Sequence, residues 1–165
     1  MNLHDYYRDA ILPAYALLPP RMGSAAATAM IIASGLQESD LTYRRQFNDG
    51  PARGTHMFEE GGGVFGVLQH SASRAFAEKC CVELGVQPDR HAVWVALEHN
   101  DVLAAVFARL LLFTHPHPLP IPLDEVVVRD VSWEYYRWLW RPGAPRPDDW
   151  PANWTRACEF VSTAP

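Results

Sequence analysis

The chain has 165 residues and a mass of 18.6 kDa, which is the size of one ordinary domain, so we expect a single domain over residues 1–165. With 48% hydrophobic and 20% charged residues, the composition excludes an intrinsically disordered protein. The formal net charge of -5 argues against nucleic acid as a partner, because binding to phosphates needs a basic face.

Two helices are predicted before residue 40. Residues 3–18 have the pattern of a short helix that is interrupted by a proline. Ser24 is a suitable N-cap for an apolar helix over 25–37. Gly35 inside this second helix indicates close packing against a neighbour. Glu38 therefore falls at the C-terminal end of an apolar helix.

The segment 42–60 loses the helical periodicity. Because 48–51 is the strong turn sequence Asn-Asp-Gly-Pro, residues 43–47 and 52–58 are predicted to form the arms of a small β-hairpin or an irregular excursion. The three glycines at 61–63 end this excursion and begin a short helix.

Five further helices are predicted in the rest of the chain, and most of their starts carry a capping side chain or a first-turn proline. They span residues 71–84, 88–97, 100–113, 124–140 and 148–161. We therefore expect a mainly α fold with one small β-hairpin after the second helix.

The cysteines and the apolar segments bear on the compartment. The chain has three cysteines without zinc-site spacing, and Cys80 and Cys81 are neighbours, so we expect small buried hydrophobes in a reducing compartment. The N-terminus lacks the basic flank and apolar run of a secretory signal. The apolar stretch 25–33 is too short to span a bilayer, and Arg109 interrupts the stretch 102–113. We expect no signal peptide and no membrane insertion.

Glu38 is the residue in this sequence whose position best suits chemistry. The partial negative charge of a helix C-terminus and an apolar surround both raise the pKa of a carboxylic acid. A pKa near 6 suits a general acid at neutral pH. If the hairpin folds across Glu38, it forms the second wall of a cleft in which a glycosidic bond is split.

An ordered set of short motifs surrounds Glu38 and continues near the C-terminus. The set consists of Glu38-Ser39, Gly50-Pro51-Ala52-Arg53-Gly54, Phe58-Glu59, Gly61-Gly62-Gly63, Tyr135-Tyr136, Trp140-Arg141-Pro142-Gly143-Ala144-Pro145 and Trp150. It resembles the lysozyme-like superfamily, and within it the phage-encoded peptidoglycan-degrading proteins related to soluble lytic transglycosylases. The resemblance covers most of the chain.

The resemblance implies a lysozyme-like domain that cleaves the β-1,4 bond between N-acetylmuramic acid and N-acetylglucosamine in bacterial peptidoglycan. The activity is that of a lytic transglycosylase, which leaves a 1,6-anhydro product, or of a muramidase. A chitinase-like enzyme is a third possibility. The competing class is a non-catalytic virion structural or peptidoglycan-binding protein that keeps the fold.

The same resemblance implies a bacteriophage context, as an endolysin or as a component of the virion. Peptidoglycan is then the partner, joined by other virion proteins in the second case. The protein is expected to be made in the host cytoplasm and to act in the periplasm or at the cell wall, or to be carried in the virion.

The resemblance and the chemistry together identify candidate site residues. Glu38 is expected to be the catalytic acid and base, with Ser39, Glu59 and Asp49 as candidate supporting residues. Substrate contacts are expected from the hairpin and from the C-terminal helices, namely Arg53, His56, Met57, Phe58, Tyr135 and Tyr136.

One departure from the family pattern concerns a glutamine. A Gly-x-x-Gln segment after the acid lines the cleft in that family, and Met57 stands where we expect this glutamine after Gly54. His56 is a candidate substitute. The missing glutamine supports the non-catalytic alternative, whereas Glu38-Ser39 supports the enzyme.

Other polar and aromatic residues are assigned more generally. Arg44, Arg45 and Arg53 either form a basic rim that captures peptidoglycan carboxylates or solvate an exposed hairpin. The tryptophans of the C-terminal helices, Trp133, Trp138 and Trp140, are expected in the core.

No metal or cofactor is expected. The seven histidines lack zinc-site spacing, and the glycines 61–63 lack the lysine and hydroxyl residue of a phosphate loop.

Overall fold

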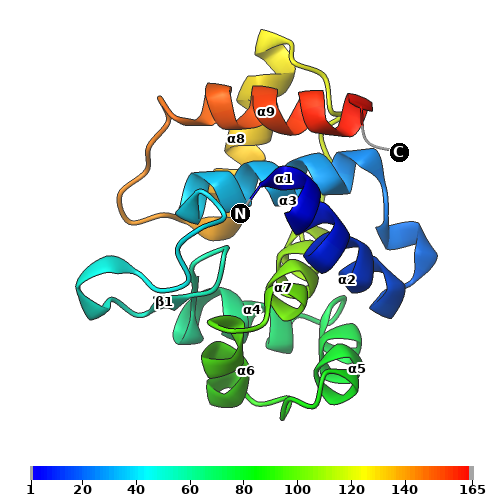
Figure 1. Ribbon diagram of the computed structural model, residues 1–165, viewed down its shortest axis with the longest axis vertical. Coiled ribbons are helices and arrows are strands. Elements are labelled where there is room, and N and C mark those ends of the chain that lie inside the picture. The colour runs from blue at the N-terminus through cyan, green and yellow to red at the C-terminus, as the bar shows by residue number, and fades with distance from the viewer. Residues whose placement is uncertain (1, 164–165) are drawn as a thin grey trace.

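The computed structural model describes residues 2–163, which form a mainly helical protein with one two-stranded antiparallel sheet (Figure 1). The α-helices are α1 Leu3–Tyr6, α2 Leu12–Leu17, α3 Ala25–Ser39, α4 Phe65–Gln69, α5 Arg74–Glu83, α6 Arg90–Leu97, α7 Asp101–Phe113, α8 Val126–Trp140 and α9 Trp150–Thr163. The strands are β1 Ala52–Arg53 and β2 Phe58–Glu59. Short π-helical turns join α1 to α2 and β2 to α4, over Tyr7–Ile11 and Glu60–Val64.

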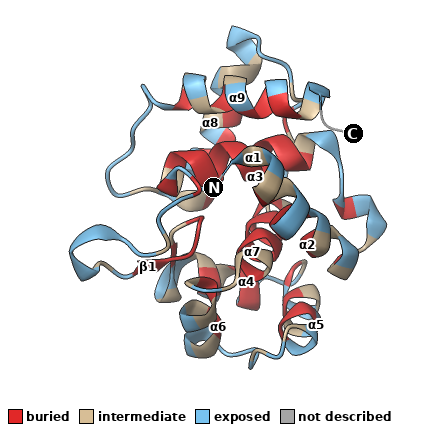
Figure 2. Ribbon diagram, viewed as in Figure 1, coloured by how far each residue is buried: buried red, intermediate tan, exposed pale blue. Residues whose placement is uncertain are grey.

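Helix α7 lies at the centre of the packing. All its residues from Leu103 to Leu112 are buried, including Arg109, whose Nε donates to the carbonyl of Met22 at 2.7 Å. Helices α2, α3, α4, α5 and α6 all contact α7. Figure 2 shows both α3 and α7 as largely buried helices. The apolar stretch 102–113, which Arg109 makes unsuitable as a membrane span, therefore forms the central helix of the core.

Helix α3 positions the acid. As predicted, the Ser24 side chain caps it by accepting from the backbone N–H of Ala27 at 3.1 Å. The helix ends at Ser39, two residues later than predicted, so Glu38 lies in its last turn. Helix α9 packs along α3 (Figure 1). Gly35 allows close packing, as expected, because a Cβ there would lie 2.3 Å from a methyl of Leu41.

The hairpin differs from its prediction in where it turns. The paired strands are β1 and β2, with Arg53 opposite Phe58, so the turn is made by 54–57 and not by 48–51. The predicted first arm contributes only an isolated bridge from Arg45 to Arg53. The reason is local backbone conformation: Gly54 and Met57 have positive φ angles of 75° and 47°, which close the turn.

The later helices form near their predicted ranges with shifted starts. Asn100 caps α7 as predicted, by accepting from the N–H of Leu103 at 2.9 Å. Helix α5 begins after Ser73 rather than Ser71, and α6 is capped by Asp89 rather than opened by Pro88. Cys80, Cys81 and Cys158 are buried and unbridged, in agreement with the prediction. Between residues 2 and 163, no helix is long and apolar enough to cross a membrane.

The hairpin turn generates a stability prediction. A Cβ at Gly54 would lie 2.8 Å from the backbone oxygen of Leu97, and its φ of 75° disfavours other residues. We expect Gly54→Ala to lower the free energy of unfolding by about 2 kcal/mol, measured by urea denaturation. Gly61→Ala is the matched control, because no atom lies within 4 Å of a Cβ there. Equal stability of the two variants would contradict this account of the turn.

Candidate active site

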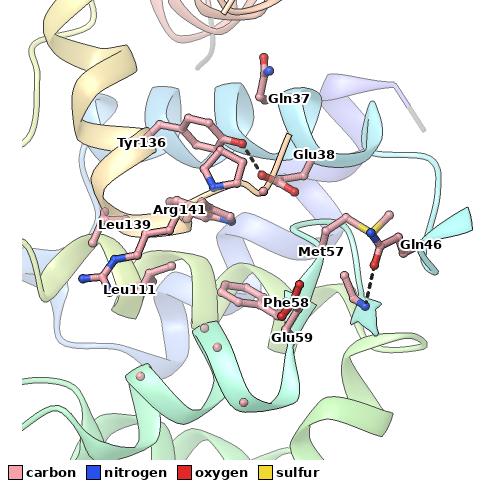
Figure 3. A pocket seen from close by; sticks show the side chains of 18 of the residues that line it. Gln37, Glu38, Gln46, Met57, Phe58, Glu59, Leu111, Tyr136, Leu139 and Arg141 are labelled. Atoms are coloured by element: carbon pink, nitrogen blue, oxygen red, sulfur yellow. Dashed lines mark hydrogen bonds between the residues drawn. The ribbon is translucent and has the colours of Figure 1, made fainter. Parts of the chain in front are cut away.

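A groove of about 840 Å³ opens in front of Glu38 (Figure 3). One side is formed by the end of α3, the segment after it and the hairpin. The opposite side is formed by α8 and the loop that follows it, and the glycine-rich turn with α4 supplies the floor. Glu38 and Glu59 are the carboxylates among the described residues that line it.

Glu38 is half-buried and hydrogen-bonded within this groove. The hydroxyl of Tyr136 donates to Glu38 Oε1 (Figure 3). Burial raises the pKa of Glu38 to about 7, and nearby Glu59 adds to this effect. The Tyr136 hydrogen bond and the positive charge of Arg146 act in the opposite direction but are smaller. Glu38 is therefore a carboxylic acid that still holds its proton close to neutral pH.

Tyr136 is held firmly on α8. Its ring stacks on Trp150 with centroids 4.8 Å apart and on Trp140 with centroids 5.5 Å apart. Burial and the adjacent Glu38 raise the pKa of the Tyr136 hydroxyl above its ordinary value. Because that hydroxyl stays protonated, it remains a donor to Glu38 whether or not the carboxyl group ionises. The structure places Tyr136 in the groove, as predicted.

Gln37, which the sequence analysis did not identify, ties the loop after α8 to the acid. Its buried side chain donates to the carbonyl of Arg146 at 2.9 Å and accepts from Asn153 Nδ2 at 2.9 Å. The guanidinium of Arg146 in turn donates to the Gln37 carbonyl. The available clue was a polar amide inside an apolar helix directly before Glu38, although its partners lie over a hundred residues away.

Strand β2 and the residue before it bring three of the predicted residues to the groove. Met57, Phe58 and Glu59 all line it, although Phe58 is largely buried (Figure 3). The ring of Phe58 packs against Phe107 and Trp140, with centroids 6.4 and 6.1 Å apart. Phe58 is therefore part of the wall and offers only an edge to a ligand, whereas Met57 and Glu59 present their side chains.

His56 and Ser39 lie behind the wall rather than in the groove. His56 is fully buried, with the Tyr6 hydroxyl 3.0 Å from Nε2 and the Ser34 hydroxyl 3.3 Å from Nδ1. Burial lowers the pKa of His56 to about 3, so the ring is neutral. Ser39 donates to the carbonyl of Thr55 at 2.7 Å. The prediction of His56 as a substrate contact is wrong, and Ser39 supports the site by joining α3 to the hairpin.

Arg53 and Asp49 also lie outside the groove lining. Arg53 is buried, pairs with Glu98 at 3.0 Å and packs over the Trp94 ring at 4.5 Å. Asp49 is 90% exposed and pairs with Arg45 at 3.5 Å. The predicted roles of Arg53 in substrate binding and of Asp49 in supporting catalysis are therefore not compatible with their positions. Their charges instead fasten the hairpin.

The basic rim predicted on the hairpin is largely neutralised. Arg44 pairs with Asp101 at 2.6 Å, and Arg45 pairs with Glu98 at 3.3 Å. Asp101 belongs to α7, and Glu98 directly follows α6. Because both lie more than fifty residues from the arginines, the sequence around the arginines does not reveal these ion pairs. The three hairpin arginines are therefore bound to the protein itself.

Of the predictions for aromatic residues of α8, some agree with the structure and others are wrong. Tyr135 lies outside the groove lining because its hydroxyl donates to the carbonyl of Leu112 at 3.0 Å and its ring stacks on His115 at 3.7 Å. The prediction of Tyr135 as a substrate contact is therefore wrong. Trp138, expected in the core, is 48% exposed and lines the groove. Trp133 packs between Tyr136 and Trp150 as a core residue would.

The Gly-x-x-Gln pattern occurs later than the position considered in the sequence. Gly66-Val67-Leu68-Gln69 forms most of α4, and Gly66 lines the groove. Met57, which lies nearer to Glu38 along the chain, also lines the groove. Gln69 itself lies at the exposed end of α4.

The described residues contain no candidate metal site. Among residues 2–163, no three His, Cys, Asp or Glu side chains come together in a way that could hold a metal ion.

Comparison with known proteins identified no relative. No protein-family model, curated protein or solved structure matches the chain.

The raised pKa of Glu38 has a thermodynamic consequence that does not depend on activity. The folded state resists ionisation of Glu38, so its contribution to stability falls as pH rises from the ordinary value of 4.5 through about 7. We expect Glu38→Gln to raise the free energy of unfolding above that of the wild type by about 2 kcal/mol at pH 8 and by much less at pH 5. Glu159→Gln, at an exposed position on α9, is the control and should show no such trend. A difference independent of pH would contradict the assigned pKa.

Proposed function

We propose that this protein is a lysozyme-like glycosidase that cleaves the β-1,4 bond between N-acetylmuramic acid and N-acetylglucosamine in bacterial peptidoglycan. The observation that carries the proposal is Glu38, a half-buried acid with a pKa raised to about 7 at the centre of an open groove. A general acid works best when its pKa lies near the working pH.

The hydrogen bond from Tyr136 assigns different tasks to the two carboxyl oxygens of Glu38. Oε1 accepts from the Tyr136 hydroxyl, so the acidic proton resides on Oε2. In the proposed step Oε2 protonates the oxygen that leaves the muramyl C1 carbon, and the sugar–oxygen bond breaks as positive charge develops on the ring. The Tyr136 hydroxyl then stabilises the carboxylate that remains.

The fate of the muramyl carbon separates two product classes. In a lytic transglycosylase, the Glu38 carboxylate takes the proton of the muramyl 6-hydroxyl, whose oxygen attacks C1 and closes a 1,6-anhydro ring. In a muramidase, water attacks instead, and Glu59 is the groove carboxylate available to activate it. The two products differ in mass by one water molecule.

An exposed aromatic pair in the lining of the groove supports a carbohydrate ligand. Tyr43 and Phe47 are 49% and 69% exposed, and their ring centroids lie 4.9 Å apart. Both residues line the groove. Exposed aromatic faces are costly in water and bind the apolar faces of sugar rings. We propose that this pair holds the glycan strand on one side of the scissile bond.

A second candidate function is binding of peptidoglycan without cleavage, as in a structural component of a phage particle. The observation that favours it is the thioether of Met57 in the groove, together with the exposed position of Gln69 at the end of α4. As an enzyme, the protein would act at the cell wall, either as a phage endolysin or as part of a virion. Peptidoglycan is the proposed partner in each case.

Turnover of purified peptidoglycan tests the enzyme directly. We expect soluble muropeptides from the wild type and at least about a hundredfold fewer from Glu38→Gln, because the amide cannot protonate the leaving oxygen. Mass spectrometry distinguishes anhydro from reducing muramyl ends. The rate should decline above about pH 7, as Glu38 loses its proton. Glu159→Gln should behave as the wild type.

If neither the wild type nor the variant releases products, and both sediment with cell walls, then the enzyme is excluded and the binding function stands. Cleavage of chitin oligomers without cleavage of cell walls would instead favour a chitinase-like activity.

The aromatic pair gives an independent prediction. We expect Tyr43→Ala and Phe47→Ala each to raise KM for glycan strands about fivefold with a small change in kcat, because the rings contact sugars remote from the cleaved bond. Val82→Ala, an exposed apolar position on α5, is the control. An unchanged KM in both aromatic variants would remove the pair from the binding site.

A further inference from the structure

Arg141 differs from the other arginines around the groove in lacking a carboxylate partner. Arg44, Arg45 and Arg53 are paired with acidic residues, and Arg146 pairs with Asp149 at 3.1 Å. Arg141 lines the groove but makes no ion pair within residues 2–163. In a protein of net charge -5, Arg141 is thus an exposed cation of the groove lining that is available to an anionic ligand.

The backbone directs Arg141 at some cost. It terminates α8 in a left-handed conformation with φ 48° and ψ 52°, a region usually occupied by glycine. Local strain of this kind concentrates at functional positions.

The guanidinium is also left with free donors. Arg141 Nε donates to the carbonyl of Trp138 at 3.3 Å, and the guanidinium carbon lies 5.9 Å from the Trp138 ring centre. The two terminal amino groups have no hydrogen-bond partner among the described residues. This planar fork matches the two oxygens of a carboxylate.

The charges of the groove are distributed unevenly along it. Glu38 and Glu59 both line it, and Arg141 and Gln46 lie on opposite sides of Glu38 (Figure 3). An anionic group on a ligand is repelled by Glu59 and attracted toward Arg141. The exposed Trp138 ring beside it offers a surface for the apolar part of the same ligand.

We propose that Arg141 and Trp138 form a subsite for a carboxylate carried by the glycan substrate, which makes the groove selective for acidic glycans over neutral β-1,4 polymers. This inference rests on the proposed function, since it assigns the specificity of the same groove. The carboxylate belongs either to the lactyl group of a muramyl sugar or to an attached peptide. Arg141 is a specificity-determining residue and takes no part in proton transfer.

Binding measured without turnover tests the subsite. In a Glu38→Gln background, calorimetry would compare three tetrasaccharides: a muramyl glycan with free lactyl carboxylates, the same glycan with peptide stems, and neutral chitotetraose. We expect Arg141→Gln to weaken binding of at least one acidic ligand about tenfold and to leave chitotetraose unchanged. Arg141→Lys should recover only part of the loss, because an ammonium cannot form the paired contact.

The matched control is Arg137→Gln. Arg137 is an exposed arginine of α8 that pairs with Glu134 at a distance of 2.6 Å, and it does not line the groove. Loss with the free lactyl glycan alone identifies the lactyl group as the source, and loss with the peptide-bearing glycan alone identifies the peptide. Equal weakening of all three ligands, or no weakening of any, overturns the subsite.

The outcomes separate this inference from the proposed function. If the wild type releases muropeptides but Arg141→Gln keeps its full preference for acidic ligands, the subsite fails and the enzyme stands. If acidic ligands lose affinity in Arg141→Gln but the wild type releases no products, the subsite stands in a protein that binds without cleaving.

Discussion

Three consecutive residues at the end of α3 connect the two walls of the groove to the acid between them. Gln37 is bonded to the loop before α9, Ser39 is bonded to the hairpin turn, and Glu38 faces the space that these two attachments leave open. The helix fixes the directions of all three side chains, since successive residues point about 100° apart. A shift of α3 by one residue would place Gln37 or Ser39 in the groove instead of Glu38 and would break their hydrogen bonds. The register of this helix therefore determines the arrangement of the site.

Opposing influences set the character of Glu38. Burial favours the protonated form, whereas Tyr136 and Arg146 favour the charged form. Without these two groups the pKa of Glu38 would be higher still, and without burial the carboxyl group would ionise closer to its ordinary value of 4.5. The aromatic stack of Tyr136 with Trp140 and Trp150 keeps the hydroxyl in place against thermal motion. Core packing on α8 thus acts on the protonation of a residue on α3.

The parts of the fold and of the candidate site that depend on neighbouring residues could be predicted from the sequence. The Ser24 cap, the apolar run behind it and the position of Glu38 depend on neighbouring residues, so the placement of Glu38 at the end of this helix could be predicted from sequence. The hairpin turn was misplaced because Asn48 to Pro51 has strong turn chemistry but lies in a loop, with positive φ at Asn48 and Asp49. Partnerships across long separations were out of reach, above all Arg44 with Asp101 and Gln37 with Asn153. These pairs decide which cations and amides remain free for a ligand.

The buried His56 lowers the stability of the folded state at low pH, and the half-buried Glu38 lowers it at higher pH. Protonating His56 inside the wall is unfavourable, so its neutral burial costs stability as pH falls from 6.5 toward about 3. Ionising Glu38 is unfavourable as pH rises from 4.5 toward about 7. The combined contribution of the two groups is therefore most favourable in mildly acidic solution. In that range Glu38 retains its proton, so the pH at which these two groups together favour the folded state is also one at which the groove holds an uncharged carboxyl group at Glu38.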